Sequence, residues 1–105
     1  MFDSGDISGT ITSPATNTRQ VDVASIAINW TGTSPVGVLT VEARNGEDDT
    51  WSELDFGQAI NITGNTGEHT ILFNELHFEE IRLVYTATSG TGTLDAILLA
   101  KTVGA

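Results

Sequence analysis

The sequence contains no cysteine, so neither a disulfide framework nor a thiolate nucleophile or metal ligand is available to the fold. Long apolar runs are missing too. No stretch approaches the length of a membrane span, and the acidic start of the chain lacks the apolar segment of a signal peptide. We therefore expect a soluble protein made in the cytoplasm, whose fold depends on apolar burial and hydrogen bonds between strands.

Basic residues are also scarce. The chain has 4 Lys and Arg residues against 14 Asp and Glu residues, a formal net charge of −10. Such a charge repels a phosphate backbone or an anionic membrane surface. We expect neither nucleic acid nor membrane as a partner, and we interpret the acidity as an aid to solubility.

A chain of 105 residues is long enough for one hydrophobic core, whereas two separate domains of half that length would each be only marginally stable. Its apolar residues alternate with polar ones in short runs between Gly and Thr, which is typical of strands. The predicted strands are 6–13, 21–30, 36–44, 51–56, 59–63, 68–74, 80–88 and 93–103. About eight strands in one small domain predict an all-β fold, an antiparallel β-sandwich of jelly-roll-like type.

Residues 1–20 are rich in Ser, Thr, Gly and Asn and weakly patterned, so we expect an N-terminal arm or edge strand beside a sandwich domain over residues 21–105. In 21–30 the apolar residues change from odd positions (Val21, Val23) to even ones (Ile26, Ile28, Trp30), which predicts a bulge or bend near residues 24 and 25. Residues 74–80 are expected to form a loop or one helical turn. Two hairpins are predicted, one with a charged tip at 44–51 and one turning at 89–92.

The last predicted strand is apolar on both faces. Leu94, Ala96 and Leu98 share one parity, and Ile97 and Leu99 share the other. A strand of this kind is either central beneath a covering loop or buried against another chain. The sequence leaves both interpretations open.

Catalytic chemistry has few candidates, because the chain offers two histidines, His69 and His77, and neither lies in a known motif. His77 is close to Glu75, Glu79 and Glu80 without a metal-binding spacing, so we predict no catalytic, cofactor or metal site. The carboxylates of Glu47, Asp48 and Asp49 could attract calcium, but their spacing differs from an EF-hand loop. A charged hairpin tip that discourages edge association is the favoured interpretation.

Aromatic side chains could stack on sugar rings if they were exposed. The four candidates are Trp30, Trp51, Phe56 and Tyr85. The alternation places most of them with core residues, so core packing is the favoured interpretation.

Two segments, SIAINWTGTSPVGVLTVEARNGEDDTWSEL and EIRLVYTATSGTGTLDAILLAK, resemble small β-sandwich proteins of tailed phages, which are grouped with capsid decoration, cement or fibre-associated proteins. The matching blocks are 30–39, with a WTGTPxGTL-like pattern, 44–51, a hairpin before a Trp, and 81–94, with a VRLVYTxTSGTGTL-like pattern. The hairpin RNGEDDTW is longer and more acidic than the family's, so the resemblance implies no contact through that tip. No catalytic residue is implied.

The resemblance implies a non-enzymatic virion protein at the capsid surface, made in the host cytoplasm and bound to the major capsid protein or other virion proteins. A capsid decoration protein that forms a homo-oligomer, with a trimer favoured, is the first hypothesis. A receptor- or carbohydrate-binding module of a tail or fibre is the alternative. The predicted oligomer or capsid interface combines the last strand with the N-terminal arm, through Leu94, Ile97, Leu98, Leu99, Phe2 and Ile7.

Overall fold

The computed structural model describes residues 1–19, 21–46, 49–54, 60–73 and 78–101. Within these ranges all regular structure is β-strand, and every strand pairing is antiparallel. The strands are β1 (Phe2–Asp6), β2 (Ile11–Thr12), β3 (Thr16–Asn17), β4 (Val23–Arg44), β5 (Ser52–Glu53), β6 (Ile60–Thr63), β7 (Thr66–Phe73) and β8 (Glu80–Lys101). The predicted all-β class is confirmed. The predicted loop or turn at 74–80 lies largely outside the described residues.

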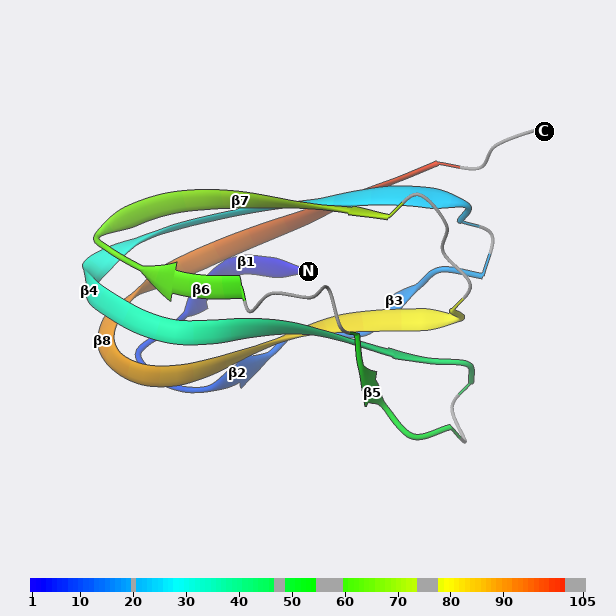
Figure 1. The fold of residues 1–105 in the computed structure, drawn as a ribbon, viewed down its shortest axis with the longest axis horizontal. Coiled ribbons are helices and arrows are strands. Elements are labelled where there is room, and N and C mark those ends of the chain that lie inside the picture. The colour runs from blue at the N-terminus through cyan, green and yellow to red at the C-terminus, as the bar shows by residue number, and fades with distance from the viewer. Residues whose placement is uncertain (20, 47–48, 55–59, 74–77, 102–105) are drawn as a thin grey trace.

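Two long strands, β4 and β8, form the centre of the sheet. Each has 22 residues, and they pair from Val23 opposite Lys101 to Arg44 opposite Glu80. Both strands turn back on themselves together at one end of the molecule (Figure 1), where the register shifts after Thr33. One hydrogen-bonded sheet is thereby folded into two halves that face each other.

The prediction of separate strands on either side of residues 89–92, joined by a hairpin turn, is therefore wrong. Glycines at the bend explain why the turn-like composition bends the strand instead of reversing it. Gly32 lies opposite Gly92, and a Cβ on Gly32 would lie 2.1 Å from the carbonyl oxygen of Thr91. Gly90 has a φ of +85°, and its Cβ would lie 2.2 Å from the oxygen of Ser34. The two backbones bend in close contact there, which only glycine permits.

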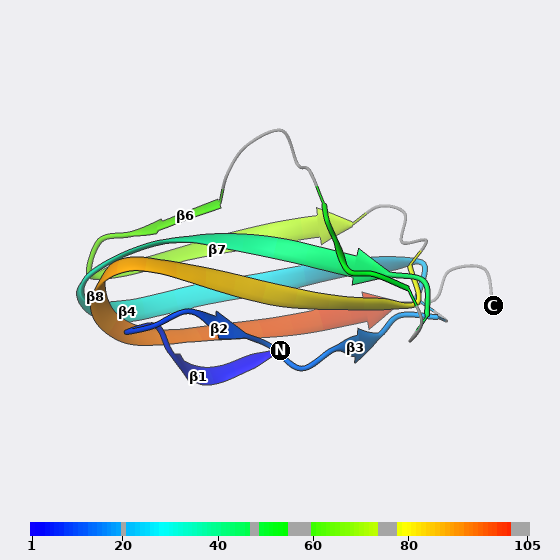
Figure 2. The same ribbon diagram turned by 90° about the horizontal axis from the view of Figure 1, so that it is seen from below.

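One half, called the β7 half, contains β7, residues 23–33 of β4, residues 91–101 of β8, and β1. The other, the β6 half, contains β5 and β6, residues 36–44 of β4, residues 80–89 of β8, and β2 and β3. The N-terminal residues therefore follow the edge of both halves as three short strands (Figure 2). The predicted strand at 6–13 is wrong, because β1 ends at Asp6 and a turn separates it from β2.

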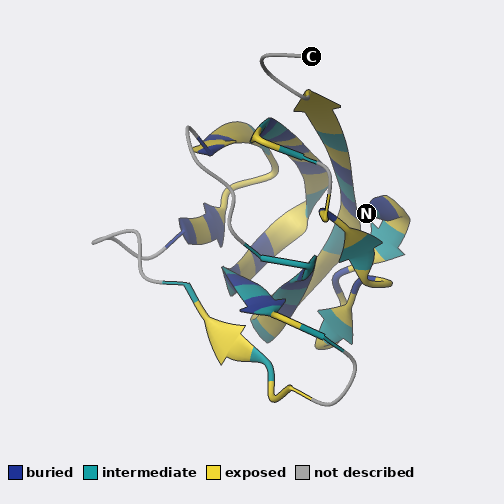
Figure 3. Ribbon diagram, turned by 90° about the vertical axis from the view of Figure 1, so that its right-hand side faces the viewer, coloured by how far each residue is buried: buried dark blue, intermediate teal, exposed yellow. Residues whose placement is uncertain are grey.

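The hydrophobic core lies between the two halves, and buried and exposed residues alternate along the long strands (Figure 3). Ala24 faces this core with Ile26, Ile28 and Trp30. The register of β4 against β8 is continuous from Val23 to Thr33. The bulge predicted near Ala24 and Ser25 is therefore absent from this described stretch. Val21 precedes the strand, and Val23, its first residue, is half-buried and has the outward parity of Ser25 and Ala27.

Candidate binding surface

The outward face of the β7 half carries exposed apolar side chains on neighbouring strands. Leu72 of β7 and Leu99 of β8 flank Ser25 of β4, and Ile97 lies beside Ala27 in the next row. Leu72, Ile97 and Leu99 are 70%, 66% and 60% exposed. These three side chains with Ala27 are called the apolar patch. Isolated exposed leucines are ordinary on protein surfaces, whereas a contiguous group is typical of an interaction site.

A shallow hollow of about 240 Å³ opens at one end of the apolar patch. Its lining includes Leu72 and Leu99 and also Val23, Phe73 and Lys101. A partner side chain that entered this hollow would contact both the exposed leucines and the edge of the core.

Charges of opposite sign flank the apolar patch. The outward residues of β8 run in the order Asp95, Ile97, Leu99, Lys101, because alternate residues of a strand face the same side. Glu68 of β7 shares the row of Asp95 across the sheet. Oδ1 of Asp95 accepts a hydrogen bond of 2.8 Å from the backbone N–H of Ser4, which fixes the carboxylate in place. The patch is thus acidic at one end and basic at the other.

The residues predicted to form an interface divide into two groups. Ile97 and Leu99 are exposed, and Leu98 is half-buried against the core. Leu94 and Ile7 are fully buried, and Phe2 is 7% exposed. The assignment of these last three to an interface is wrong, because their side chains fill the space between the halves.

Leu72 was not predicted as part of this surface. The signal was present in the sequence, since Ile71 and Phe73 take the core-facing parity in β7 and leave Leu72 outward. What the sequence could not show is that β7 lies beside β4, which brings Leu72 into one row with Leu99.

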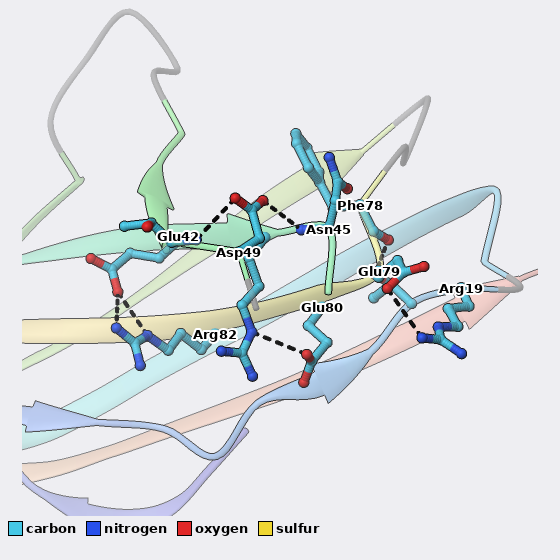
Figure 4. Close-up of polar contacts among 11 residues, drawn as sticks. Arg19, Glu42, Asn45, Asp49, Phe78, Glu79, Glu80 and Arg82 are labelled. Carbon is cyan, nitrogen blue, oxygen red and sulfur yellow. Dashed lines mark hydrogen bonds and ion pairs between the residues drawn. The ribbon is translucent and has the colours of Figure 1, made fainter. Parts of the chain in front are cut away.

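The outward face of the β6 half is charged. Arg82 Nη2 lies 2.7 Å from Glu42 Oε1, and Arg44 Nε lies 3.1 Å from Glu80 Oε1. Figure 4 shows the Arg82–Glu42 pair, together with Arg19 and Glu79 from other segments, whose Nη2 and Oε2 atoms are 3.1 Å apart. Glu42 lies directly opposite Arg82, and Arg44 directly opposite Glu80, on β4 and β8, so these two ion pairs stabilise the sheet locally.

Trp51 lies over this charged face. The guanidinium carbons of Arg44 and Arg82 are 4.5 Å and 4.2 Å from the centre of its ring, within the range of cation–π attraction. Trp30 and Tyr85 are buried, as the alternation predicts. Phe56 lies outside the described residues. Among the described members of the predicted sugar platform, only Trp51 is left partly exposed.

Tyr85 places its phenol in the core against Gly37, whose Cβ would lie 2.4 Å from the Tyr85 hydroxyl. The hydroxyl has no hydrogen-bond partner among the described residues. Burial raises the pKa of Tyr85 above its usual value of 10.0.

The predicted ion-binding candidates are scattered. His69 is exposed on β7, Glu79 pairs with Arg19, and Glu80 pairs with Arg44. Oδ2 of Asp49 accepts the backbone N–H of Asn45 at 3.0 Å, which closes the hairpin. Glu47, Asp48, Glu75 and His77 lie outside the described residues. Across the described ranges no cluster of three metal-ligating side chains is present.

No helix long enough to cross a membrane occurs in the described part of the chain. Comparison of the chain with protein-family models, with curated proteins and with solved structures finds no match. The likeness to phage proteins stays a prediction based on three short segments. Two of these segments, 30–39 and 81–94, contain the bends of β4 and β8, and the third is the hairpin that carries Trp51.

Proposed function

We propose that this protein is a non-enzymatic structural component of a phage virion, a capsid decoration or cement protein that stabilises the shell through oligomeric contacts. The observation that supports this proposal best is the apolar patch, which leaves Leu72, Ile97 and Leu99 at least 60% exposed. An apolar face with charges at its ends is a binding surface for protein.

A patch of this size suits weak contacts repeated many times. Burial of an exposed Leu or Ile side chain contributes about 1.5 to 3 kcal/mol at most, part of which offsets the entropy lost on association. One such contact is weak alone. On a shell, many copies bind at once, and the second contact of a linked pair forms at high effective concentration.

The path of the chain is a further support, by analogy of fold. The order is β7, β4, β8, β1 in one half and β6, β4, β8, β2 in the other. Strands that alternate between two facing layers in this manner are typical of jelly-roll domains, which viral capsid proteins and lectins share. Since one fold supports many roles, this likeness favours the proposal without specifying the partner.

Imaging of intact particles of a phage that encodes this chain tests the proposal. The expected result is density for the folded sheet at regular positions on the capsid. Density on the tail would favour the alternative below, and particles that lack the chain would refute both.

The alternative is a tail or fibre module that binds receptors or carbohydrate, and the exposure of Trp51 favours it. An indole supported by two guanidinium groups is held in place and could stack on a sugar ring. A glycan array would test it with Trp51→Ala and, as the matched control, Trp51→Phe. Binding lost in the first variant and retained in the second would support the alternative, and no binding by the native protein would refute it.

A further inference from the structure

We infer that the apolar patch binds the same patch of a second copy of this chain, and that the two copies are related by a two-fold axis across the strands. The inference rests on the proposed function in one respect, since it names the partner of the surface proposed there. The partner is deduced from the order of apolar and charged residues along β8.

The order along β8 is self-complementary. Asp95, Ile97, Leu99 and Lys101 point outward at equal spacing, so Leu98 marks the midpoint of the series. When a second copy lies face to face with its strands reversed about that midpoint, Lys101 of each copy faces Asp95 of the other, and Leu99 faces Ile97. On β4, Ser25 of each copy then faces Ala27 of the other. These small side chains allow the two sheets to approach to the usual separation of about 10 Å.

Charge selects this orientation over the other face-to-face arrangement. If the axis ran along the strands, each row of residues across β7, β4 and β8 would face the same row of the other copy. The acidic row of Glu68 and Asp95 would then lie against the same two carboxylates of the other copy. Like charges that face each other in an interface are strongly unfavourable. The reversed arrangement instead forms two symmetric pairs of Lys101 with Asp95, one at each end of the apolar patch.

A two-fold pair also fits the number of surfaces involved. Two-fold contacts use the same patch on both copies, whereas a trimer needs two different patches that fit each other. Along β8 and β4 the outward residues match themselves, and Leu72 of each copy faces Thr70 of the other, so a dimer replaces the trimer that the sequence favours. Each copy carries a formal charge of −10, and the mutual repulsion at long range makes a weak dimer that tightens as salt screens it.

Sedimentation equilibrium of the isolated chain over roughly 1 µM to 1 mM, at about 0.15 M salt, tests the inference. We expect a reversible dimer. Leu99→Asp should weaken it about 100-fold, since it places a carboxylate in the apolar centre of the contact. Thr86→Asp is the matched control. It adds the same charge on the exposed outer face of the β6 half and should leave the dimer unchanged.

A charge exchange tests the orientation. Lys101→Glu alone should weaken the dimer about tenfold, because it replaces two attractive pairs by two repulsive ones. Adding Asp95→Lys to Lys101→Glu should restore most of the native affinity. Thermal unfolding of both variants checks that loss of the Ser4 hydrogen bond leaves the fold intact.

A strict monomer, a trimer, or a dimer indifferent to Leu99→Asp would overturn the inference, and a dimer without rescue by the exchange would overturn its orientation. Failure here is distinct from failure of the proposed function. A monomer found on the capsid by imaging would refute the dimer alone, and a dimer missing from the particles would refute the capsid role alone.

Discussion

Replacement of Tyr85 by Phe removes a hydroxyl that is buried in the core without a partner among the described residues, and leaves the ring in place. A buried hydroxyl that makes no hydrogen bond costs about 1 to 3 kcal/mol in the folded state. The ring of Phe fits the same site beside Gly37, so no cavity of importance forms. We therefore expect the variant to be more stable by about 1 to 2 kcal/mol, or roughly 5 to 10 °C in Tm for a domain of this size.

The same variant has a distinct pH dependence. Burial raises the pKa of Tyr85 in the folded protein above 10.0, so the unfolded chain loses its proton first as the pH rises. Ionisation of Tyr85 therefore leaves the stability of the native protein unchanged below about pH 10 and lowers it as the pH rises through the folded-state pKa. Tyr85→Phe should lack this alkaline loss.

Urea unfolding followed by circular dichroism at pH 7 and above pH 10 measures both effects. Because the chain has a single tyrosine, phenolate absorbance reports the ionisation of Tyr85 directly, and in the native protein it should rise together with unfolding. A variant less stable than the native protein by 1 kcal/mol or more would refute the reasoning, since it would mean that the hydroxyl has a partner.

Three further changes test other contacts of the fold. Gly67→Ala should destabilise the protein by about 2 kcal/mol in urea unfolding, because its Cβ would lie 2.1 Å from Cζ2 of Trp30. An unchanged midpoint would mean that Trp30 is free to shift. Trp51→Ala should cost about 1 to 2 kcal/mol by removing two cation–π contacts, and Trp51→Phe should recover part of it; equal stability of all three proteins would contradict the stacked arrangement. Hydrogen bonds from the backbone and side chain of Ser8 lower the pKa of Asp6 below 3.8. The ionised carboxylate of Asp6 should therefore stabilise the folded protein above pH 3.8, and this stabilisation should be lost as the pH falls through the folded-state pKa. An NMR titration of the Asp6 carboxyl with an ordinary midpoint would argue against this turn.

The period-two pattern predicted the all-β class and the shared parity of core residues such as Ile26, Ile28 and Trp30. It could not predict that β4 and β8 each continue through their bends. Ser89, Gly90, Thr91 and Gly92 have the composition of a hairpin turn, and the continuation depends on the opposite glycine of another strand. Local composition contains no information about such a long-range pairing.

Among the candidate interface residues, the sequence could not separate Leu94 from Ile97. Both belong to a strand that is apolar on two faces, and only the position of the second half of the sheet decides which face is covered. Leu72 was missed for the related reason that neighbours across strands are set by topology. Phe2 and Ile7 belong to the predicted N-terminal arm or edge strand and were expected at an interface, whereas pairing of the N-terminal strands with β8 buries both.

The central claim is that the outward face of the β7 half is the binding surface of this protein. Cosedimentation with purified capsids, for the native chain, Leu99→Asp and Thr86→Asp side by side, tests it most directly. The account predicts saturable binding of the native chain and of Thr86→Asp. Leu99→Asp disrupts the contact between copies and so loses the second attachment of the dimer, and its binding should be weaker by at least about tenfold. Equal binding by all three proteins would contradict it.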